Sequence, residues 1–550
     1  MDLSRRRVLA YAGSAVAAVA GAELAGASAA LAASPPGDVV GKISVGYQGW
    51  FACPGDGSPI GGWWHYGQNR DLPPSPTNTT LVSWPDMREH TKGYPTGYAN
   101  LGNGQPATVL SSYDQQTVDT HFRWMQQYGC DTAALQRFNP FGGEGPIRDA
   151  MTVKVRTAAE AFGRKFYIMY DVTNWTNMQS EIKTDWTDKM RAHTASSAYA
   201  KQNGKPVVCI WGFGFNDPGR PFAPAACLDV VNWFKAQGCY VIGGVPTWWR
   251  TGVSDSRPGF LDVYHAFNMI SPWMVGRASD LAGLDSYYGE VNVPDQADCN
   301  ARGIDYQPCV MPGELSAGVR RHGDFMWRHF YNMVRVGCQG IYISMFDEYN
   351  EGNQIAKTAE NASMQPTNFG RRALDEDGTA CSSDYYLRIT ADGGRMLKGQ
   401  LALTATRPTQ PVVGGTPPPT TGIVSLRSRV NSLYVCADSA GAAALIANRT
   451  AVGPWEQFDL VTLTGGNVAL RARINGLYVC AENAGAAALI ANRTAVGPWE
   501  TFQLVTNANG AVSLRATVNS RYVQAANATT PLIAAATAIG AAEQFDLVTG

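Results

Sequence analysis

The sequence has little charge for its length. Charged residues make up 16% of the 550 residues, and the formal net charge is -1, whereas about 25% of the residues are charged in average soluble domains. Lysine and arginine form no rich run beyond the extreme N-terminus. Because such a chain has no basic field for a nucleic-acid backbone, we expect no nucleic acid among its partners.

Metal-ligand patterns are also missing. The 11 cysteines contain no Cys-x-x-Cys pair and no histidines at zinc-site spacing, so we expect no metal and no cofactor. Because the number of cysteines is odd, at least one thiol stays unpaired in a monomer. A monomer is the oligomeric state that we expect. Cys299 and Cys309 are close enough in sequence to bridge a loop, and the wider disulfide connectivity stays open.

The first 33 residues have the pattern of an export signal. Ser4-Arg5-Arg6-Arg7 precedes an Ala-rich stretch interrupted by Glu23, and small residues at 30–33 suit a signal peptidase. This segment resembles a bacterial twin-arginine signal. A membrane anchor is the alternative, but it would need about 20 strongly apolar residues. We therefore expect a secreted, extracellular protein that keeps no membrane contact once residues 1–33 are removed.

A stretch rich in proline, threonine and glycine at 406–422 predicts a linker between two folded parts. The length supports this division, since one hydrophobic core stops growing at roughly 250 to 300 residues. We expect a catalytic domain at 38–405 and a second domain at 423–550.

The second part contains a threefold repeat with a period of about 44 residues. The stretch "VSLRSRVNSLYVCADSAGAAALIANRTAVGPWEQFDLV" returns almost unchanged and then more loosely. Short alternating runs separated by Asn, Gly and Pro turns predict strands. Three such units resemble an all-β β-trefoil of the fascin-like or ricin-like type, and the resemblance implies a carbohydrate-binding domain of a secreted enzyme. The positions expected in its core are Leu426, Leu470, Leu514, Tyr434, Tyr478, Tyr522, Phe458, Phe502 and Phe545.

The tryptophans of the repeated "GPWE" stretch, Trp455 and Trp499, allow two readings. Their rings could stack on sugar rings. Their fixed place in the repeated "GPWE" stretch instead favours a structural role within each repeat.

The first part alternates strand-like apolar runs with helix-like stretches such as 114–128, 151–162 and 228–237. Eight such units over about 370 residues predict an α/β fold, a (β/α)8 TIM barrel with insertions. The eight expected strands lie at 45–50, 132–138, 166–171, 207–211, 239–245, 267–273, 307–312 and 340–346.

The carboxyl ends of barrel strands carry the chemistry, because the loops there converge on one cavity. Here these ends combine aromatic rings with carboxylates and amides, which suit the C–H faces and the hydroxyls of sugars. The expected partner is therefore an oligosaccharide or polysaccharide. The candidate substrate-binding residues are Gln48, Trp50, Arg137, Asp171, Trp211, Trp249, Trp273 and Asp347, with Asp171 the preferred hydroxyl ligand.

The stretch "MFDEYNEG" after the eighth run supplies the candidate catalytic residues, Glu348 and Glu351. Residues three apart in one turn have Cβ atoms about 5 to 6 Å apart. Retaining glycosidases need two carboxyl groups about 5 to 5.5 Å apart. We therefore expect both side chains to point into one open cleft. A solvated acidic turn or a calcium loop is the alternative, and Asp347 alone could be a structural cap.

This stretch resembles the Glu-Trp-His-Glu-Gly signature of glycoside hydrolase family 99, the endo-α-mannosidases, and of the related family 71. Similarity continues through "VGYQGWF", "LQRF", "YDVT" and "SPWMVGR" over most of 40–400. The resemblance implies that Glu351 is the general acid/base. It implies that Glu348 is a base assisting the substrate's 2-hydroxyl through an anhydro-sugar intermediate. The sequence departs from the signature at Asp347, Tyr349 and Asn350, where the family has Asn, Trp and His.

Together these features predict a secreted retaining glycosidase that cleaves an α-linked, mannan-like glycan. A xylosidase or arabinosidase would keep the carboxylates but reshape the loops. A non-catalytic glycan-binding protein would need only the aromatic cleft, and a calcium-dependent adhesion module would need oxygen ligands near Asp347.

Overall fold

The computed structural model describes residues 33–411, 420–463, 467–507 and 509–549. The chain divides into two compact units, Met1–Pro411 and Val412–Gly550. Most of the expected signal segment (1–32) and the middle of the expected linker (412–419) lie outside the described residues. Among the helices of the described part, none is long and apolar enough to cross a membrane.

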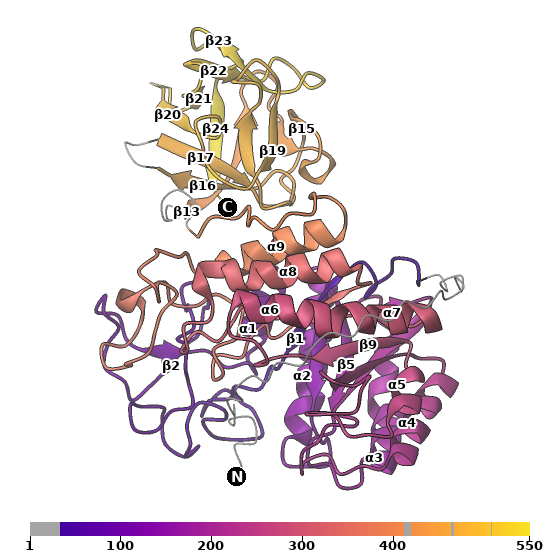
Figure 1. Ribbon diagram of the computed structural model, residues 1–550. Helices are drawn as coiled ribbons and strands as arrows, with labels where there is room; N and C mark the ends of the chain where they lie inside the picture. The colour runs from indigo at the N-terminus through magenta and orange to yellow at the C-terminus, as the bar shows by residue number, and fades with distance from the viewer. Residues whose placement is uncertain (1–32, 412–419, 464–466, 508, 550) are drawn as a thin grey trace. The chain divides into compact units, whose positions relative to one another are not determined.

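A curled parallel sheet forms the centre of the first unit (Figure 1). Its nine strands within the described residues are buried almost throughout, because helices pack on the outside of the sheet and the side chains of its curled inner face fill the inside. Each of the eight predicted runs overlaps one of these strands, and the ninth strand, β10, lies just before the run predicted at 307–312. In sheet order they are β10 (Asp305–Tyr306), β9 (Met269–Trp273), β8 (Tyr240–Pro246), β7 (Lys205–Trp211), β5 (Lys165–Asp171), β4 (Thr132–Arg137), β1 (Ile43–Tyr47), β12 (Ile341–Ile343) and β11 (Cys309–Val310).

The predicted closed barrel is only partly formed. The edge strands β10 and β11 follow each other in the chain, separated by Gln307 and Pro308, but β10 pairs only with β9 and β11 only with β12. Pro308 has no N–H to donate, so a continuous ladder cannot run through this segment. The sheet is therefore a half-barrel. It curls so far that Gln307 and Pro308 connect its two edge strands, β10 and β11, without a ladder between them.

Helices follow most strands and pack on the outside of the sheet. The predicted helical stretches fall in α1 (Gln115–Gln127), α2 (Gly145–Ala161) and α4 (Pro224–Ala236). The remaining α-helices of the described residues are α3 (Met178–Asp185), α5 (Leu261–His265), α6 (Leu281–Tyr287), α7 (Val293–Arg302), α8 (Asp324–Val336) and α9 (Tyr385–Leu397). In Figure 1, α6, α8 and α9 lie side by side along one flank.

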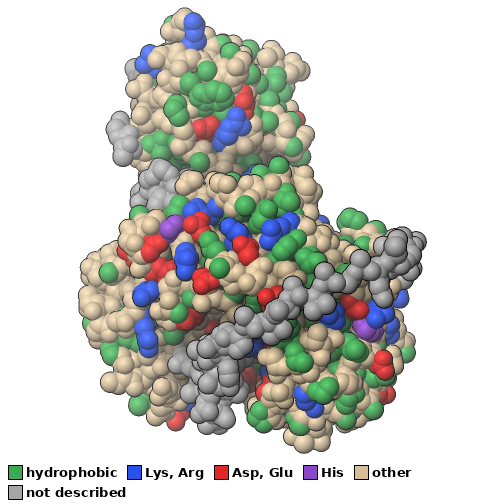
Figure 2. Space-filling model, in the orientation of Figure 1, with side chains coloured by type: hydrophobic (Ala, Val, Ile, Leu, Met, Phe, Trp, Pro, Cys, Tyr) green, Lys and Arg blue, Asp and Glu red, His purple; other side chains and the backbone are tan. Residues whose placement is uncertain are grey.

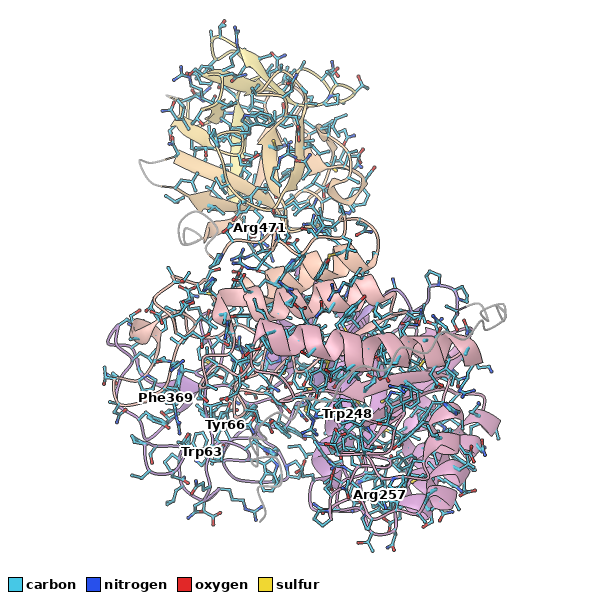
Figure 3. All side chains as sticks on the ribbon, in the orientation of Figure 1. Trp63, Tyr66, Trp248, Arg257, Phe369 and Arg471 are labelled. Carbon is cyan, nitrogen blue, oxygen red and sulfur yellow. The ribbon has the colours of Figure 1, made fainter. Side chains whose placement is uncertain are left out.

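A long insertion between β1 and α1 carries much of the aromatic content. It contains the small pair β2 (Tyr94–Pro95) and β3 (Thr108–Val109). Trp63 and Tyr66 pack edge to face at 6.1 Å and lie on the same side of the unit as Phe369 (Figure 3). The insertion therefore has its own aromatic packing, which is continuous with the main core.

No disulfide forms among the cysteines, and all 11 lie in the described residues as buried free thiols. The bridge between Cys299 and Cys309 that their spacing allowed does not form. The two residues lie in different layers, one on the helix α7 and the other on the strand β11.

The second unit is entirely antiparallel. Six strands pair in a ring, and three hairpins extend from it. The ring consists of β13 (Thr420–Ser428), β16 (Phe458–Thr462), β17 (Asn467–Ala472), β20 (Phe502–Thr506), β21 (Val512–Ala516) and β24 (Phe545–Thr549). The hairpins are β14–β15 (Tyr434–Ala437, Leu445–Arg449), β18–β19 (Tyr478–Ala481, Leu489–Arg493) and β22–β23 (Arg521–Gln524, Ile533–Ala536).

The sequence repeat returns as a packing repeat, with one correction. The expected leucines and phenylalanines are buried, but the three tyrosines are only half-buried. Each tyrosine ring instead lies under an arginine at 5.9 Å, a distance typical of cation–π contacts. These pairs are Arg427–Tyr434, Arg471–Tyr478 and Arg515–Tyr522.

The "GPWE" stretches act mainly through backbone and glutamate atoms. Glu456 and Glu500 each accept the N–H of the glycine three residues earlier. The carbonyls of Trp455 and Trp499 each accept a backbone N–H from the nearby hairpin. Both interactions recur in the third repeat, although alanine replaces tryptophan there. The indole rings are therefore not needed for the turn.

Charged side chains of both signs are interspersed on the face of the first unit seen in Figure 2. This mixture agrees with the balanced charge of the sequence. It gives that face no single-sign field for electrostatic capture of a polyanion.

Residues at the start of the expected linker are fixed to α8 and α9 of the first unit. Arg407 pairs with Asp324 at 2.9 Å. Arg388 donates to the carbonyls of Gln410 and Pro411 at 2.9 and 3.0 Å. The folded first unit therefore extends to Pro411, six residues beyond the expected end of the domain at residue 405.

We expect a chain of residues 33–411 to unfold at a higher temperature than a chain of residues 33–405. The shorter chain loses the Arg407–Asp324 pair and leaves Arg388 without two carbonyl partners. Such charge-assisted hydrogen bonds contribute about 1.5 to 3 kcal/mol each. Thermal unfolding followed by circular dichroism measures the difference. Equal midpoints would show that these contacts contribute nothing to stability.

Candidate active site

The two candidate glutamates lie in one tight turn just after β12. The N–H groups of Glu351 and Gly352 both donate to the carbonyl of Glu348, each at 3.1 Å. The predicted turn is therefore present. Its residues differ in exposure, because Glu348 is fully buried and Glu351 is half-buried.

Asp347 joins this turn to the end of β1. Its two carboxylate oxygens accept the backbone N–H groups of Gln48 and Gly49, both at 2.8 Å. Arg148 of α2 donates to the carbonyls of the same two residues at 2.6 and 2.9 Å. Burial raises the pKa of Asp347 to about 6, against the lowering effect of its backbone hydrogen bonds. Asp347 thus fixes a loop, as the capping alternative predicted.

Glu348 is held from the neighbouring strand by Gln48, whose side-chain amide donates to its carboxylate. The prediction that both glutamates open into a cleft is wrong for Glu348, whose exposed fraction is 0%. It lies beyond the end of β12, and its charge is among the causes, after burial, that raise the pKa values of Cys309 and Tyr342. The carboxylate is therefore an interior group, whereas Glu351 is half-buried.

Glu351 lies near His65, a histidine that no sequence pattern predicted as part of the site. The ring of His65 stacks on Trp50 at 4.0 Å and lies 3.9 Å from Glu144. Burial lowers the pKa of His65, whereas Glu144 and Glu351 act to raise it. His65 has φ 59°, a left-handed conformation that costs energy outside glycine. It lies in the long insertion, where no periodic pattern could have singled it out.

Trp50 is sandwiched beside these groups instead of facing solvent. Its ring is stacked with Phe138 at 5.9 Å as well as with His65. Its indole N–H is buried and has no hydrogen-bond partner among the described residues. A buried donor of this kind is costly unless some acceptor reaches it.

A second group forms where β5, β7 and β9 end. Thr173 donates its backbone N–H to Asp171 at 2.9 Å and accepts a hydrogen bond from Arg220 at 2.7 Å. Arg220 also covers the ring of Trp211 at 4.3 Å, and Trp211 packs edge to face on Trp273 at 5.3 Å. The structure thus brings together three of the predicted substrate-binding residues.

Tyr342 of β12 links the two groups across the sheet interior. Its ring packs on Trp273 at 6.4 Å, and its hydroxyl accepts a hydrogen bond from Gln136 at 3.1 Å. Glu348 is among the charges that raise the pKa of Tyr342, after burial itself. Glu348 and the strand-end tryptophans therefore border the same interior.

Arg137 and Trp249 do not belong to this site. Arg137 faces the helix layer, where it binds Asp185 of α3 at 2.5 Å and Asp149 of α2 at 2.6 Å. Trp249 donates its indole N–H to Asp295 of α7 at 2.8 Å. Both side chains are 1% exposed. Their prediction as sugar contacts is wrong. Arg137 points outward because alternate residues of a strand face opposite sides of the sheet, and Trp249 lies beyond the end of β8, in a turn that packs on α5 and α7.

The backbone around the turn is fixed by the side chain of Arg320 and by the backbone carbonyl of Tyr349. Arg320 donates to the carbonyls of Gly352 and Gln354 at 2.9 and 2.7 Å. Tyr349 accepts the N–H groups of Val82 and Ser83 through its carbonyl, both at 3.1 Å. The turn is therefore locked on both sides before any ligand binds. Within the described part of the chain, no cluster of three His, Cys, Asp or Glu residues could hold a metal ion.

Comparison with known proteins gives the following similarities. Residues 421–529 match a family described as a domain of unknown function, DUF7910. None of the curated proteins matches the sequence. Among solved structures, the chain is similar to the GH99 endo-alpha-mannosidase from Bacteroides thetaiotaomicron, with a TM-score of 0.48, 15% identity, and coverage of 66% of this chain and 98% of that chain.

Two further structures resemble a smaller part of the chain. The designed 3-fold symmetric protein ThreeFoil has a TM-score of 0.22 and 23% identity, over 23% of this chain and 98% of that one. An exo-beta-1,3-galactanase from Clostridium thermocellum has a TM-score of 0.23 and 13% identity, over 27% of this chain and 33% of that one.

We expect Arg137→Met to destabilise the protein by roughly 3 to 5 kcal/mol, because it leaves the buried carboxylate of Asp185 without its cation. Sugar binding should not change in the protein that remains folded. Urea unfolding and titration calorimetry measure the two effects. The double variant R137M/D185N should recover part of the loss. If the variant bound sugar more weakly and its stability were unchanged, Arg137 would be a sugar-binding residue.

We expect Asp347 to make the protein less stable as the pH rises from about 4 to 7. Its pKa is about 6 in the folded protein, against an ordinary value of 3.8. Between these two pH values the folded state keeps a proton that the unfolded state has lost, so the stability falls with rising pH until the carboxyl of the folded state has also ionised. The loss amounts to about 3 kcal/mol.

Asp347→Asn removes this titration. The stability difference between wild type and variant, from urea unfolding, should therefore shift in favour of the variant by about that amount between pH 4 and pH 7. A difference that is the same at both pH values would contradict the raised pKa.

Proposed function

We propose that this protein is a glycoside hydrolase that cleaves an α-linked glycan with retention of configuration. The observation that carries the proposal is the turn after β12, which holds Glu348 and Glu351 three residues apart beside the tryptophans at the strand ends. Two carboxylic acids in different environments are what glycosidic bond cleavage requires.

The two glutamates suit different roles. Glu351 is half-buried and lies near His65, so it can reach a glycosidic oxygen and exchange protons with solvent between turnovers. Glu348 is buried and oriented by the amide of Gln48. We assign Glu351 as the general acid/base and Glu348 as the base that assists the substrate's 2-hydroxyl, a role that requires the substrate to reach this buried carboxylate. This assignment follows the resemblance of the motif to family 99.

The strand-end tryptophans and Asp171 provide the sugar-binding surface. Trp273 is half-buried and presents apolar area beside Trp211, which suits the C–H face of a sugar ring. Asp171 lies at the end of β5, where Thr173 and Arg220 fix its surroundings. We propose that it binds a sugar hydroxyl. The departures at Tyr349 and Asn350 leave open a xylosidase or arabinosidase in place of a mannan-degrading enzyme.

A non-catalytic glycan-binding protein is the second candidate, and the burial of Glu348 favours it. Such a protein would use the aromatic surface without needing an accessible base. We also propose that the protein is secreted as a monomer and that its second unit is a glycan-binding β-trefoil. The ring of six strands, the three hairpins and the sequence repeat support the trefoil.

Exchange of each glutamate for glutamine tests the assignment. Glu351→Gln cannot donate a proton, so we expect hydrolysis of unactivated glycosides to fall by at least about 10²-fold. An activated aryl glycoside should suffer much less, because its leaving group needs little protonation. Glu348→Gln should damage both reactions. Rates on α-mannosides, α-glucosides, xylosides and arabinosides would also identify the sugar.

Glu290→Gln is the matched control, since Glu290 is an exposed glutamate in a short helical turn before α7. It should leave all rates unchanged. Wild type that binds these oligosaccharides but cleaves none would establish the binding-protein alternative.

A further inference from the structure

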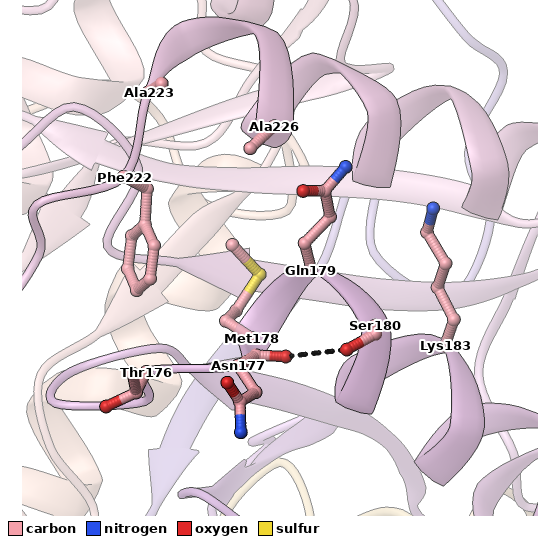
Figure 4. A pocket seen from close by; sticks show the side chains of 9 residues that line it. All are labelled: Thr176, Asn177, Met178, Gln179, Ser180, Lys183, Phe222, Ala223 and Ala226. Atoms are coloured by element: carbon pink, nitrogen blue, oxygen red, sulfur yellow. Dashed lines mark hydrogen bonds between the residues drawn. The ribbon is translucent and has the colours of Figure 1, made fainter.

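A cavity of about 590 Å³ lies between the first turns of α3 and α4, away from the two glutamates. Figure 4 shows the ring of Phe222 and the side chain of Met178 beside it, with the amide of Gln179 and the ammonium of Lys183 nearby. Thr176 and Asn177 complete its polar side. The volume is in the range of small-molecule sites, and the lining combines an aromatic face with amides and a hydroxyl.

The cavity is built on the same loops as the strand-end group. Val172 donates its N–H to the carbonyl of Trp211 at 3.1 Å, and Asn174 donates to Gly219 at 2.8 Å. These bonds join the loop after β5 to the loop after β7 along their course from the strand ends to the cavity. Thr176 is five residues beyond Asp171, so the cavity wall is at most about 18 Å from that residue along the chain.

The charges at the cavity favour an uncharged ligand. Lys183 pairs with Asp229 at 2.5 Å, and Gln179 donates to the same carboxylate at 2.8 Å. Hydrogen bonds from Gln179 and Lys183 lower the pKa of Asp229, so this carboxylate is ionised at neutral pH. The single ammonium is thereby neutralised, which leaves little electrostatic attraction for an anion.

Phe222 is held in place for contact with a ligand. Its carbonyl accepts a hydrogen bond from Arg257 at 2.7 Å, and its ring meets Phe213 edge to face at 6.5 Å. The side chain remains half-buried, so part of the ring is accessible. Because the backbone and one ring edge are fixed, a planar ligand surface can bind without first ordering this residue.

We infer that this cavity is a second glycan-binding subsite, which takes an uncharged sugar unit of an oligosaccharide that also occupies the strand-end site. The inference rests on the proposed function, because it assigns the same ligand class to both places. Phe222 would stack on the sugar ring, and Asn177, Gln179 and Thr176 would bind its hydroxyls. Long glycans would then bind more tightly than short ones.

Substitutions at Phe222 test this subsite. Phe222→Leu keeps apolar volume but removes the planar ring, whereas Phe222→Trp keeps a ring. With full-length protein, we expect F222L to raise KM for an α-mannan, α-glucan, xylan or arabinan oligosaccharide about 3- to 10-fold with kcat unchanged. F222W should restore KM, and the aryl monosaccharide glycoside should show no effect. Asn232→Ala, at an exposed position on α4, is the control.

Binding to the E351Q protein, measured by titration calorimetry with the same four oligosaccharides, separates this inference from the proposed catalysis. Weaker binding by F222L in this background supports the subsite, even where wild type cleaves nothing. Gln179→Ala provides a second variant that leaves the Phe222–Phe213 packing intact. Unchanged KM and affinity in F222L and Q179A, or no binding by any of the four oligosaccharides, would overturn the subsite.

Discussion

The carboxylate of Asp347 fixes the end of β12 to the end of β1, and the geometry of the candidate site depends on it. The same carboxylate orients the loop at Gln48, and Gln48 in turn orients Glu348. Arg148 binds the opposite side of that loop. A buried acid that accepts two backbone N–H groups cannot be replaced without leaving those donors unsatisfied. The site is therefore assembled by backbone atoms of neighbouring strands, before any side chain meets a substrate.

The sequence predicted the strands well because buried parallel strands are continuous apolar runs, and six of the eight runs here end in a polar or aromatic residue. The turn at Glu348–Glu351 was also predictable, since residue spacing alone determines which side chains share a turn. The group formed by Asp171, Trp211 and Trp273 followed from one rule, namely that parallel strands end at the same edge.

Other features depend on contacts that no local pattern records. Arg137 and Trp249 resemble sugar ligands in composition, but their partners Asp185 and Asp295 lie in helices distant in sequence. The burial of Glu348 depends on the packing of β12 against its neighbours. His65 comes from an insertion without periodicity. The gap in pairing between β10 and β11 follows from Pro308, whose effect on the ladder depends on which strand lies beside it.

The burial of the thiols makes their reactivity depend on whether the chain has folded. Burial raises the pKa of the cysteine thiols, in the case of Cys130 and Cys381 to about 12, so the reactive thiolate is almost absent from the folded protein. The unfolded chain has no such protection, and 11 thiols could combine in many incorrect pairs. An oxidising compartment would trap such pairs. Burial therefore protects the thiols from oxidation only once the native structure has formed.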